Sequence, residues 1–304
     1  MSNWKGKKIV IVGRMDCERI MHVKMIISDI QNKIKDIPEF EFKLDFETQF
    51  NIYKDELLKE DLGFLKYTQS PIIYMISEKE EKKTIIGSLE EFERYCIENF
   101  NYHYYLSEKD FKEETKNMIK ELMITNGNKY VYFDFAIENS NEKLDRVIIE
   151  LFNNKCPKTV KNFYELAIGN SVNEKGEKLS YKNTIINRIS PNSFIQGGDI
   201  KVSSGGKSIY GSNFEDEHYD IKHNYHGIVG MVKKNMFAHT NECQFYITLA
   251  PLKCFDEKFV AFGRVIKGYD TINKIGQVAT DLQRPINKIT VTDCGEYSVD
   301  LIQI

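Results

Sequence analysis

The chain has 304 residues, a formal net charge of −3 at pH 7, 41% hydrophobic residues and 29% charged residues. These values are ordinary for a soluble globular protein of about two domains, and the negative charge argues against a general nucleic-acid binder. No apolar run reaches the roughly 20 residues of a membrane-spanning helix, and the apolar run 9–12 is too short for the core of a signal peptide. We therefore expect a cytoplasmic protein that binds neither nucleic acid nor membranes.

Six cysteines are scattered along the chain, with no CxxC pair and no cluster with histidine. In a reducing compartment such residues are expected to be free thiols, mostly buried. The sequence therefore predicts neither a disulfide framework nor a metal site. The six are Cys17, Cys96, Cys156, Cys243, Cys254 and Cys294.

The first hundred residues alternate strand and helix patterns. Short apolar runs and apolar–polar alternation predict strands at 8–13, 40–46, 71–76 and 83–87. Apolar residues at spacings of three and four predict a helix from 17 to about 35, and further helices are expected at about 48–60 and 88–100. Ser88-Leu-Glu-Glu91 has the pattern of a capping box at the start of the third helix. The predicted order is β-α-β-α-β-β-α.

This order, with Pro71 immediately before the third strand, resembles the thioredoxin and glutaredoxin fold. The resemblance implies a redox cysteine where the first strand meets the first helix, and Cys17 stands there. A thiol at a helix N-terminus tends to have a lowered pKa, but Ile20 occupies the position of the resolving cysteine, so no internal disulfide can form. We interpret 1–104 as a thioredoxin/glutaredoxin-like domain that serves as a binding or structural module. The alternative is a thiol enzyme working through Cys17.

A linker helix is expected at 105–128, because Phe111, Met118, Ile119 and Leu122 lie on one helical face and Asn126-Gly127 can end the helix. After Lys129 the pattern changes to many short strands with two helices, which suggests a closed barrel. The predicted helices begin at Pro157 and near Tyr269. The predicted strands cover 130–137, 147–152, 184–189, 227–231, 244–249, 260–265 and 286–292.

Seven motifs in this second half occur in the order and spacing of one family. They are Val147-Ile-Ile-Glu-Leu-Phe152, Cys156-Pro-Lys-Thr-Val-Lys-Asn-Phe163, Phe194-Ile-Gln-Gly-Gly-Asp199, Ser208-Ile-Tyr-Gly211, Phe214-Glu-Asp-Glu217, Gln244-Phe-Tyr-Ile-Thr248 and Val260-Ala-Phe-Gly263. Together they resemble the cyclophilin family of peptidyl-prolyl cis-trans isomerases over nearly all of 129–297. The resemblance implies a cyclophilin-like domain at 129–300, a closed eight-stranded antiparallel barrel capped by two helices, with a peptide site on its outer face. The whole architecture, with a thioredoxin-like domain ahead of a divergent cyclophilin, resembles a class of two-domain cyclophilin-like proteins, which implies protein-folding or protein-interaction work in the cytosol.

The implied reaction needs no metal or cofactor. Rotation about an X–Pro amide faces a barrier of roughly 18–20 kcal/mol, because resonance gives the C–N bond double-bond character. A catalyst must favour the twisted state, in which the proline nitrogen carries a lone pair. A fixed guanidinium can donate to that lone pair, while an apolar pocket holds the proline ring. Proline-containing peptides and proteins are thus the expected partners.

The resemblance assigns roles to individual positions. Arg188 matches the catalytic arginine, and Gln196 matches the glutamine that binds the peptide backbone and orients the arginine. The remaining positions implied to line the substrate groove are Phe194, Gln244, Tyr246, Phe255, Val232, Lys233 and Phe259.

Several positions depart from the family pattern. Ser193 replaces a pocket phenylalanine, Phe259 replaces a histidine on the rim, and Cys254 stands where a tryptophan contacts cyclosporin. We therefore expect a slow or selective isomerase and weak cyclosporin binding. Lys233, in place of an asparagine, suggests a preference for acidic residues beside the proline. The alternative is a catalytically weak proline-peptide binding module whose N-terminal domain docks a partner.

Overall fold

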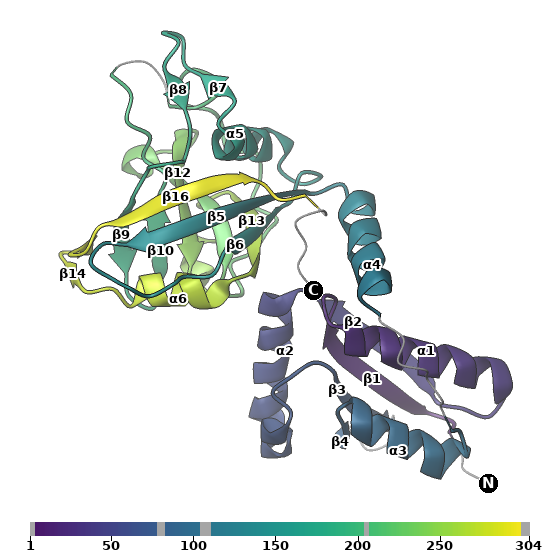
Figure 1. The fold of residues 1–304 in the computed structure, drawn as a ribbon. Helices are drawn as coiled ribbons and strands as arrows, with labels where there is room; N and C mark the ends of the chain where they lie inside the picture. The colour runs from purple at the N-terminus through teal and green to yellow at the C-terminus, as the bar shows by residue number, and fades with distance from the viewer. Residues whose placement is uncertain (1–3, 78–82, 104–110, 204–206, 299–304) are drawn as a thin grey trace. The chain divides into compact units, whose positions relative to one another are not determined.

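The computed structural model describes residues 4–77, 83–103, 111–203 and 207–298 (Figure 1). These residues form two compact units that divide between Leu122 and Met123. The first part of the predicted linker, up to residue 110, lies outside the described residues. None of the helices in the described ranges is both long enough and apolar enough to cross a membrane.

The N-terminal unit is built on a four-stranded sheet in the order β2-β1-β3-β4. Strand β1 runs parallel to β2 and antiparallel to β3, and β4 is antiparallel to β3. The predicted β-α-β-α-β-β-α order is confirmed, whereas membership of the thioredoxin class stays a prediction. The strands are β1 (Lys7–Arg14), β2 (Glu39–Asp45), β3 (Ile72–Ser77) and β4 (Lys83–Gly87); the helices are α1 (Glu18–Lys33), α2 (Glu47–Glu60), η1 (Leu62–Lys66) and α3 (Leu89–Phe100).

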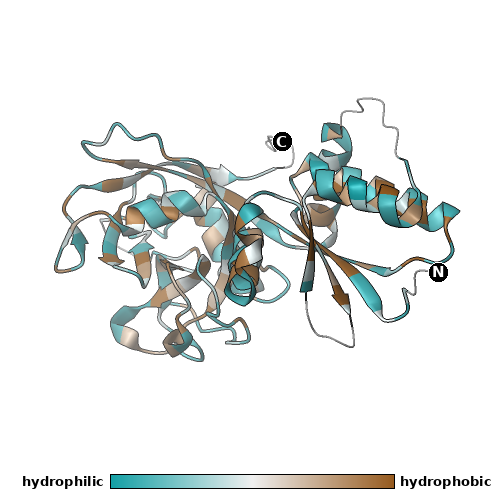
Figure 2. Cartoon of the chain, turned by 90° about the horizontal axis from the view of Figure 1, so that it is seen from below, coloured by the Kyte–Doolittle hydropathy of each residue, from teal (hydrophilic) through white to brown (hydrophobic). Residues whose placement is uncertain are grey.

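Both faces of this sheet are covered, which explains why β1 is a continuous apolar run. Ile9 and Ile11 pack with residues of α1 and α3, while Val10 and Val12 pack with residues of α2. Successive strand residues point to opposite faces, so a strand buried on both sides must be apolar at every position. In Figure 2 the strands of this unit carry hydrophobic stretches with hydrophilic ends, while its helices mix hydrophobic and hydrophilic residues.

Two further features of the N-terminal unit match the sequence patterns. The backbone N–H of Ser88 donates to the Glu91 carboxylate at 2.9 Å, which completes the predicted capping box. Cys17 is the N-cap of α1, and its Sγ lies 3.5 Å from the carbonyl oxygen of Ser70. The peptide bond from Ser70 to Pro71 is cis. The fold therefore brings Cys17 and Pro71 to the same end of the sheet.

Helix α4 (Lys112–Thr125) follows the undescribed segment. The ring of Phe111, just before it, stacks on His22 of α1 with centroids 5.6 Å apart, and Met118 contacts Lys24. Phe111 and Ile119 are buried. The apolar face predicted for this helix thus packs against α1.

The C-terminal unit is an eight-stranded antiparallel sheet in the order β16-β5-β6-β13-β11-β12-β10-β9. Its two edges meet: the segment before β9 bridges to β16, with Val291 N–H donating to the Thr184 carbonyl at 2.9 Å. The predicted eight-stranded antiparallel barrel with two helices is confirmed. The strands are β5 (Lys129–Ile137), β6 (Val147–Leu151), β9 (Ile186–Ser190), β10 (Phe194–Gly197), β11 (Ile228–Lys233), β12 (Asn241–Thr248), β13 (Ala261–Lys267) and β16 (Ile289–Glu296); the helices are α5 (Pro157–Ile168) and α6 (Tyr269–Gly276).

Aromatic side chains fill the barrel interior. The rings of Phe133, Phe163, Phe245 and Tyr181 lie 5.0–5.8 Å apart and are fully buried. The hydroxyl of Tyr181 donates to the Cys243 carbonyl at 2.7 Å, so this buried polar group is satisfied. Because the interior is packed, a peptide site on this barrel has to use the outer surface.

The sequence patterns missed β10 and two small hairpins. Strand β10 has only four residues and ends at a glycine pair, which removes the usual strand signal. The hairpins β7 (Ser171–Val172) with β8 (Lys178–Leu179), and β14 (Thr280–Asp281) with β15 (Arg284–Pro285), have strands of two residues. Such strands are too short to show periodicity.

Candidate functional site

Four positions form one row across the outer face of the barrel. Arg188 of β9 pairs with Gln196 of β10, Gln196 pairs with Tyr246 of β12, and Tyr246 pairs with Gly230 of β11. Directly opposed residues of antiparallel strands project from the same face. The neighbouring Phe245 belongs to the barrel core, so the row faces outward. Strand alternation alone therefore gathers these residues from four strands.

A groove of about 760 Å³ lies over this row. All nine residues predicted to form the site line it: Arg188, Phe194, Gln196, Val232, Lys233, Gln244, Tyr246, Phe255 and Phe259. The sequence patterns did not single out seven further lining residues: Asp199, Lys207, Lys234, Asn235, Met236, Thr240 and Glu242. The structure thus brings the predicted positions together, while their individual roles stay predictions.

Arg188 is exposed at one side of the groove and is held by a residue outside the predicted set. Its Nε donates to Oε1 of Gln283 at 2.7 Å, and its guanidinium carbon lies 5.2 Å from the centre of the Phe194 ring. Among the described residues neither of its Nη atoms has a hydrogen-bond partner, so these donors are available to a bound peptide.

The expected contact between Gln196 and Arg188 is not made. The amide of Gln196 instead donates to Oε1 of Gln244 at 2.8 Å. Gln283, in the tight turn between β14 and β15, orients the arginine. No motif marks this turn, and Gln283 lies 95 residues along the chain from Arg188, so no sequence pattern identified it.

Four aromatic rings form the apolar part of the groove. Phe255 lies 5.5 Å from Phe194, 5.2 Å from Tyr246 and 4.7 Å from Phe259, measured between ring centroids. Tyr246 and Phe259 are buried, whereas Phe194 and Phe255 are partly exposed. Phe259, expected on the rim, therefore supports the groove from below, and Phe194 and Phe255 offer the accessible apolar surface.

Beneath these rings, Tyr246 is anchored by a buried chain of hydrogen bonds. Its hydroxyl donates to Nε2 of His223 at 2.6 Å, and Nδ1 of His223 contacts Oδ1 of Asp256 at 2.8 Å. Burial lowers the pKa of the fully buried His223. The neutral ring can then accept from Tyr246 on one nitrogen while it donates to Asp256 from the other. Burial also raises the pKa of Tyr246, which keeps its hydroxyl protonated.

Gly230 makes this anchoring possible. A Cβ at position 230 would lie 2.2 Å from the hydroxyl oxygen of Tyr246, far inside contact distance. The tyrosine occupies space that any side chain at 230 would need. The sequence patterns did not identify His223, Asp256 or Gly230. These residues come together around Tyr246 only because segments far apart in the chain pair with one another.

Replacing Tyr246 with phenylalanine is expected to reduce the free energy of unfolding by about 1–3 kcal/mol, because Nε2 of the buried His223 loses its partner. Chemical unfolding would measure this. Tyr210→Phe is a matched control, since its hydroxyl donates to the Lys158 carbonyl at 2.9 Å from an exposed position. Equal costs for the two variants would contradict the buried anchor.

The buried His223 also predicts a pH dependence. Its folded pKa is lowered by burial, whereas an unfolded histidine titrates near 6.5. Below about pH 6.5 the unfolded chain binds a proton that the folded chain does not, so the free energy of unfolding falls as pH drops. We expect a smaller loss between pH 7.5 and 5.5 in a His223→Gln variant. An unchanged pH dependence would contradict this role for His223.

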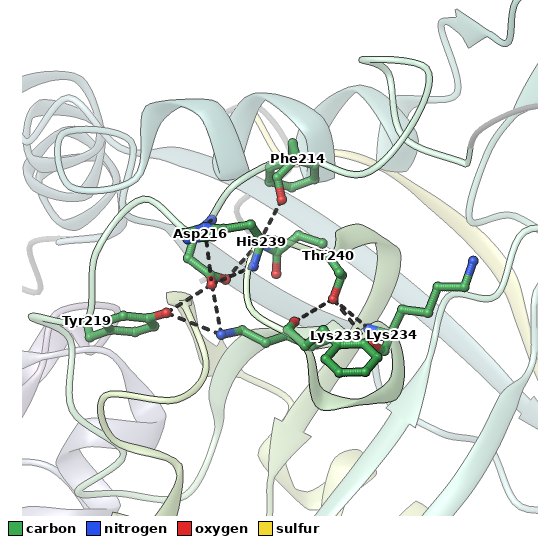
Figure 3. A network of polar contacts seen from close by, with 9 residues as sticks. Phe214, Asp216, Tyr219, Lys233, Lys234, His239 and Thr240 are labelled. Carbon is green, nitrogen blue, oxygen red and sulfur yellow. Dashed lines mark hydrogen bonds and ion pairs between the residues drawn. The ribbon is translucent and has the colours of Figure 1, made fainter.

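Lys233 is held in a buried polar network beside the groove (Figure 3). Its Nζ lies 2.9 Å from Oδ2 of Asp216 and 3.2 Å from the Tyr219 hydroxyl, and the side chains of Lys233 and Asp216 are only 5% and 1% exposed. Asp216 also accepts from the Tyr219 hydroxyl, the backbone N–H of His239 and the amide of Asn241, each at 2.9 Å. Burial opposes ionisation of Asp216, but these hydrogen bonds outweigh it and lower its pKa.

This network changes the interpretation of Lys233. Its charge is neutralised by Asp216, so it is not free to attract an acidic residue beside the proline. The network also ties down the turn 234–240 at the edge of the groove, where the Lys234 N–H donates to the Thr240 hydroxyl at 3.0 Å. The network therefore helps to fix the position of this turn, while Lys233 itself lines the groove.

The described residues contain no group of three or more His, Cys, Asp or Glu side chains arranged to hold a metal ion. The site therefore offers aromatic rings, amides and one available guanidinium. Such groups can bind a peptide and donate hydrogen bonds to it.

Comparison with known proteins agrees with this geometry. The family described as cyclophilin type peptidyl-prolyl cis-trans isomerase/CLD matches residues 132–296. The human protein named probable inactive peptidyl-prolyl cis-trans isomerase-like 6 is 43% identical over 170 residues, which cover 55% of this chain and 53% of that protein. The chain thus spans about half the length of that relative.

Two fungal proteins are also similar. Peptidyl-prolyl cis-trans isomerase D of Saccharomyces cerevisiae is 38% identical over 169 residues, covering 55% of this chain and 71% of the yeast protein. Peptidyl-prolyl cis-trans isomerase cyp11 of Rhizopus delemar is 36% identical over 183 residues, which cover 57% of this chain and 52% of that protein. With these matches over the whole barrel, the chain belongs to the cyclophilin-type peptidyl-prolyl cis-trans isomerase family.

Proposed function

We propose that the barrel binds proline-containing segments of proteins and accelerates the cis/trans isomerisation of their X–Pro bonds. The observation that carries this proposal is the position of Arg188, whose free Nη donors lie beside the aromatic groove. The proline ring would rest on Phe194 and Phe255, which expose apolar surface. The family membership of the chain supports the same activity.

In this mechanism the protein favours the twisted amide. As the C–N bond rotates, resonance is lost and the proline nitrogen gains a lone pair. Arg188 donates to that lone pair, and this bond is stronger in the twisted state than in either planar isomer, so it lowers the barrier. The amides of Gln196 and Gln244 bind the peptide backbone on the other side of the ring. No covalent step and no cofactor is required.

A peptide-binding module without useful turnover is the second candidate. Ser193 stands at the position implied for a pocket phenylalanine, and losing such an aromatic wall weakens proline binding by roughly 1–3 kcal/mol. The human relative is itself named probable inactive. In this case the N-terminal unit would dock a partner, and the barrel would hold a proline-containing segment of it.

Exchange-based NMR of an Ala-Pro peptide separates the two candidates. The isomerase predicts that a catalytic amount of the chain increases the cis/trans exchange rate. The binding module predicts chemical-shift changes of the peptide with no faster exchange. If the peptide shows neither effect at millimolar protein, both candidates are wrong for this sequence.

We infer a docking or structural role, in the cytosol, for the N-terminal unit. Cys17 is half-buried, and Ile20 at the position of a resolving cysteine is fully buried. This arrangement supports the interpretation as a thioredoxin-like module that has no dithiol chemistry.

Cyclosporin is expected to bind weakly, with a Kd above about 1 µM. Cys254 is exposed at the position implied for a tryptophan, and a thiol supplies neither the indole N–H nor its ring area. Calorimetric titration would measure the affinity, and Cys254→Trp should strengthen it. Sub-micromolar binding by the unmodified chain would contradict this expectation.

A further inference from the structure

A second cavity, of about 390 Å³, lies on the barrel unit outside the groove. Its walls come from three separate segments: 178–185 at the hairpin β7–β8 and the entry to β9, 199–201 after β10, and Lys288 before β16. The lining residues are Lys178, Ser180, Lys182, Asn183, Thr184, Ile185, Asp199, Ile200, Lys201 and Lys288.

This cavity concentrates positive charge in a chain whose net charge is −3. Each of the three segments contributes lysine, and Asp199 is the one acid among the lining residues. The Asp199 carboxylate already pairs with Lys207 at 2.6 Å, and Lys182 pairs with Asp293 at 2.8 Å. The other three lysines of the cavity, Lys178, Lys201 and Lys288, make no ion pair within the described ranges. These three like charges line one cavity and repel one another, and a bound anion would reduce that repulsion.

Neutral hydrogen-bond donors accompany these charges. Ser180 Oγ accepts from the Lys182 N–H at 3.2 Å, which leaves its hydroxyl hydrogen free to donate. Asn183 has a left-handed backbone with a φ of 69° and an exposed side chain amide. By contrast, the Thr184 hydroxyl already donates to the Tyr181 carbonyl at 2.7 Å. Ammonium groups with hydroxyl and amide donors suit an anion that has several acceptor oxygens.

The lining distinguishes a phosphate group from a nucleic acid. No aromatic side chain lines the cavity, so it lacks the stacking surfaces that single-stranded nucleic acids use. A compact cavity also differs from the extended basic track that a polynucleotide backbone needs. A single phosphoryl group, with two negative charges and three oxygens, matches the three unpaired lysines.

We propose that this cavity is a binding site for a phosphate-class anion, held mainly by Lys178, Lys201 and Lys288. The anion is either free phosphate or a phosphorylated side chain of a partner protein. Asp199 lines both this cavity and the groove, so the two sites are neighbours on one surface. The site does not depend on isomerase activity.

The proposal is tested by titrating the full chain with sodium phosphate at constant ionic strength. NMR of the backbone amides follows the titration. Saturable shifts are expected at residues 180–185, 199–201 and 288. A Lys201→Gln/Lys288→Gln variant should bind about tenfold more weakly or worse. Lys143→Gln/Lys161→Gln removes two exposed lysines outside the cavity and should bind as the unmodified chain does. Thermal unfolding of both variants verifies that they remain folded.

A pair of proline-free peptides, one with serine and the other with phosphoserine, distinguishes the two sources of the anion. The site would be assigned to a phosphorylated partner if the phosphoserine peptide binds more tightly than inorganic phosphate and the Lys201→Gln/Lys288→Gln variant loses this tighter binding. Binding of inorganic phosphate with no gain from the peptide would assign it to free phosphate. Absence of saturable binding, or equal weakening in the control variant, would overturn the proposal. Because these peptides lack proline, failure here leaves the isomerase proposal untouched.

Discussion

Replacing Arg188 with alanine is expected to lower the catalysed rate of prolyl exchange by about 10²–10³-fold, by analogy with the loss of one oxyanion donor. In the proposed mechanism, the guanidinium donates to the proline nitrogen while the amide is twisted. Its loss therefore raises the barrier without removing the aromatic surface that binds the ring. Peptide affinity should change much less than the exchange rate, because the donor acts chiefly in the twisted state.

Three variants sharpen this measurement by exchange NMR. Arg188→Lys keeps the charge but loses the forked donor geometry and should recover only part of the rate. Gln283→Ala removes the residue that holds Nε of Arg188 at 2.7 Å, and we expect a smaller loss of rate. Arg94→Ala, at an exposed arginine of the N-terminal unit, is the control. Full activity in Arg188→Ala would show that the barrel catalyses exchange through another group.

Replacing Asp216 with alanine is expected to reduce the free energy of unfolding by about 3–5 kcal/mol. Its side chain is 1% exposed and accepts from Lys233, Tyr219, His239 and Asn241. Removing it leaves the ammonium of Lys233 buried without a counter-charge. Asp216→Ala should also loosen the turn 234–240, and with it one wall of the groove.

Urea unfolding of Asp216→Ala against Glu215→Ala measures this effect. Glu215 is the adjacent acid and also pairs with a lysine, Lys158, but its side chain is 58% exposed. Exposed ion pairs contribute about 0–1 kcal/mol, so the loss of unfolding free energy should be severalfold larger in Asp216→Ala than in Glu215→Ala. Similar costs would mean that the network around Lys233 contributes no more than an ordinary surface pair.

These two substitutions separate the two layers of the site. In the proposed site, Arg188 and the partly exposed rings of Phe194 and Phe255 would face a bound peptide. The network of Asp216 and Lys233, and the chain from Tyr246 through His223 to Asp256, support the groove. Changes in the outer layer should alter exchange or affinity at nearly constant stability. Changes in the inner layer should mainly reduce the free energy of unfolding. They should alter the groove only as a consequence of that loss.

Local sequence patterns were enough to predict much of the architecture. The run Ile9-Val-Ile-Val12 predicts a strand buried on both faces because no polar residue interrupts it, and helices cover both faces of β1. In the barrel, the resemblance to one family assigned nine residues to one site, and all nine line one groove. Strand periodicity contributes the outward direction of the strand residues among them, because alternate residues of a strand share a face.

Tertiary structure alone decided which polar groups meet. Arg188 bonds Gln283 in place of Gln196, and the Lys233 ammonium pairs with Asp216. Tyr246 reaches His223 only because Gly230 lies opposite it on the neighbouring strand. Hydrogen bonds and ion pairs act over a few ångströms between segments far apart in the chain, so a sequence pattern can place a side chain on a face but cannot name its partner.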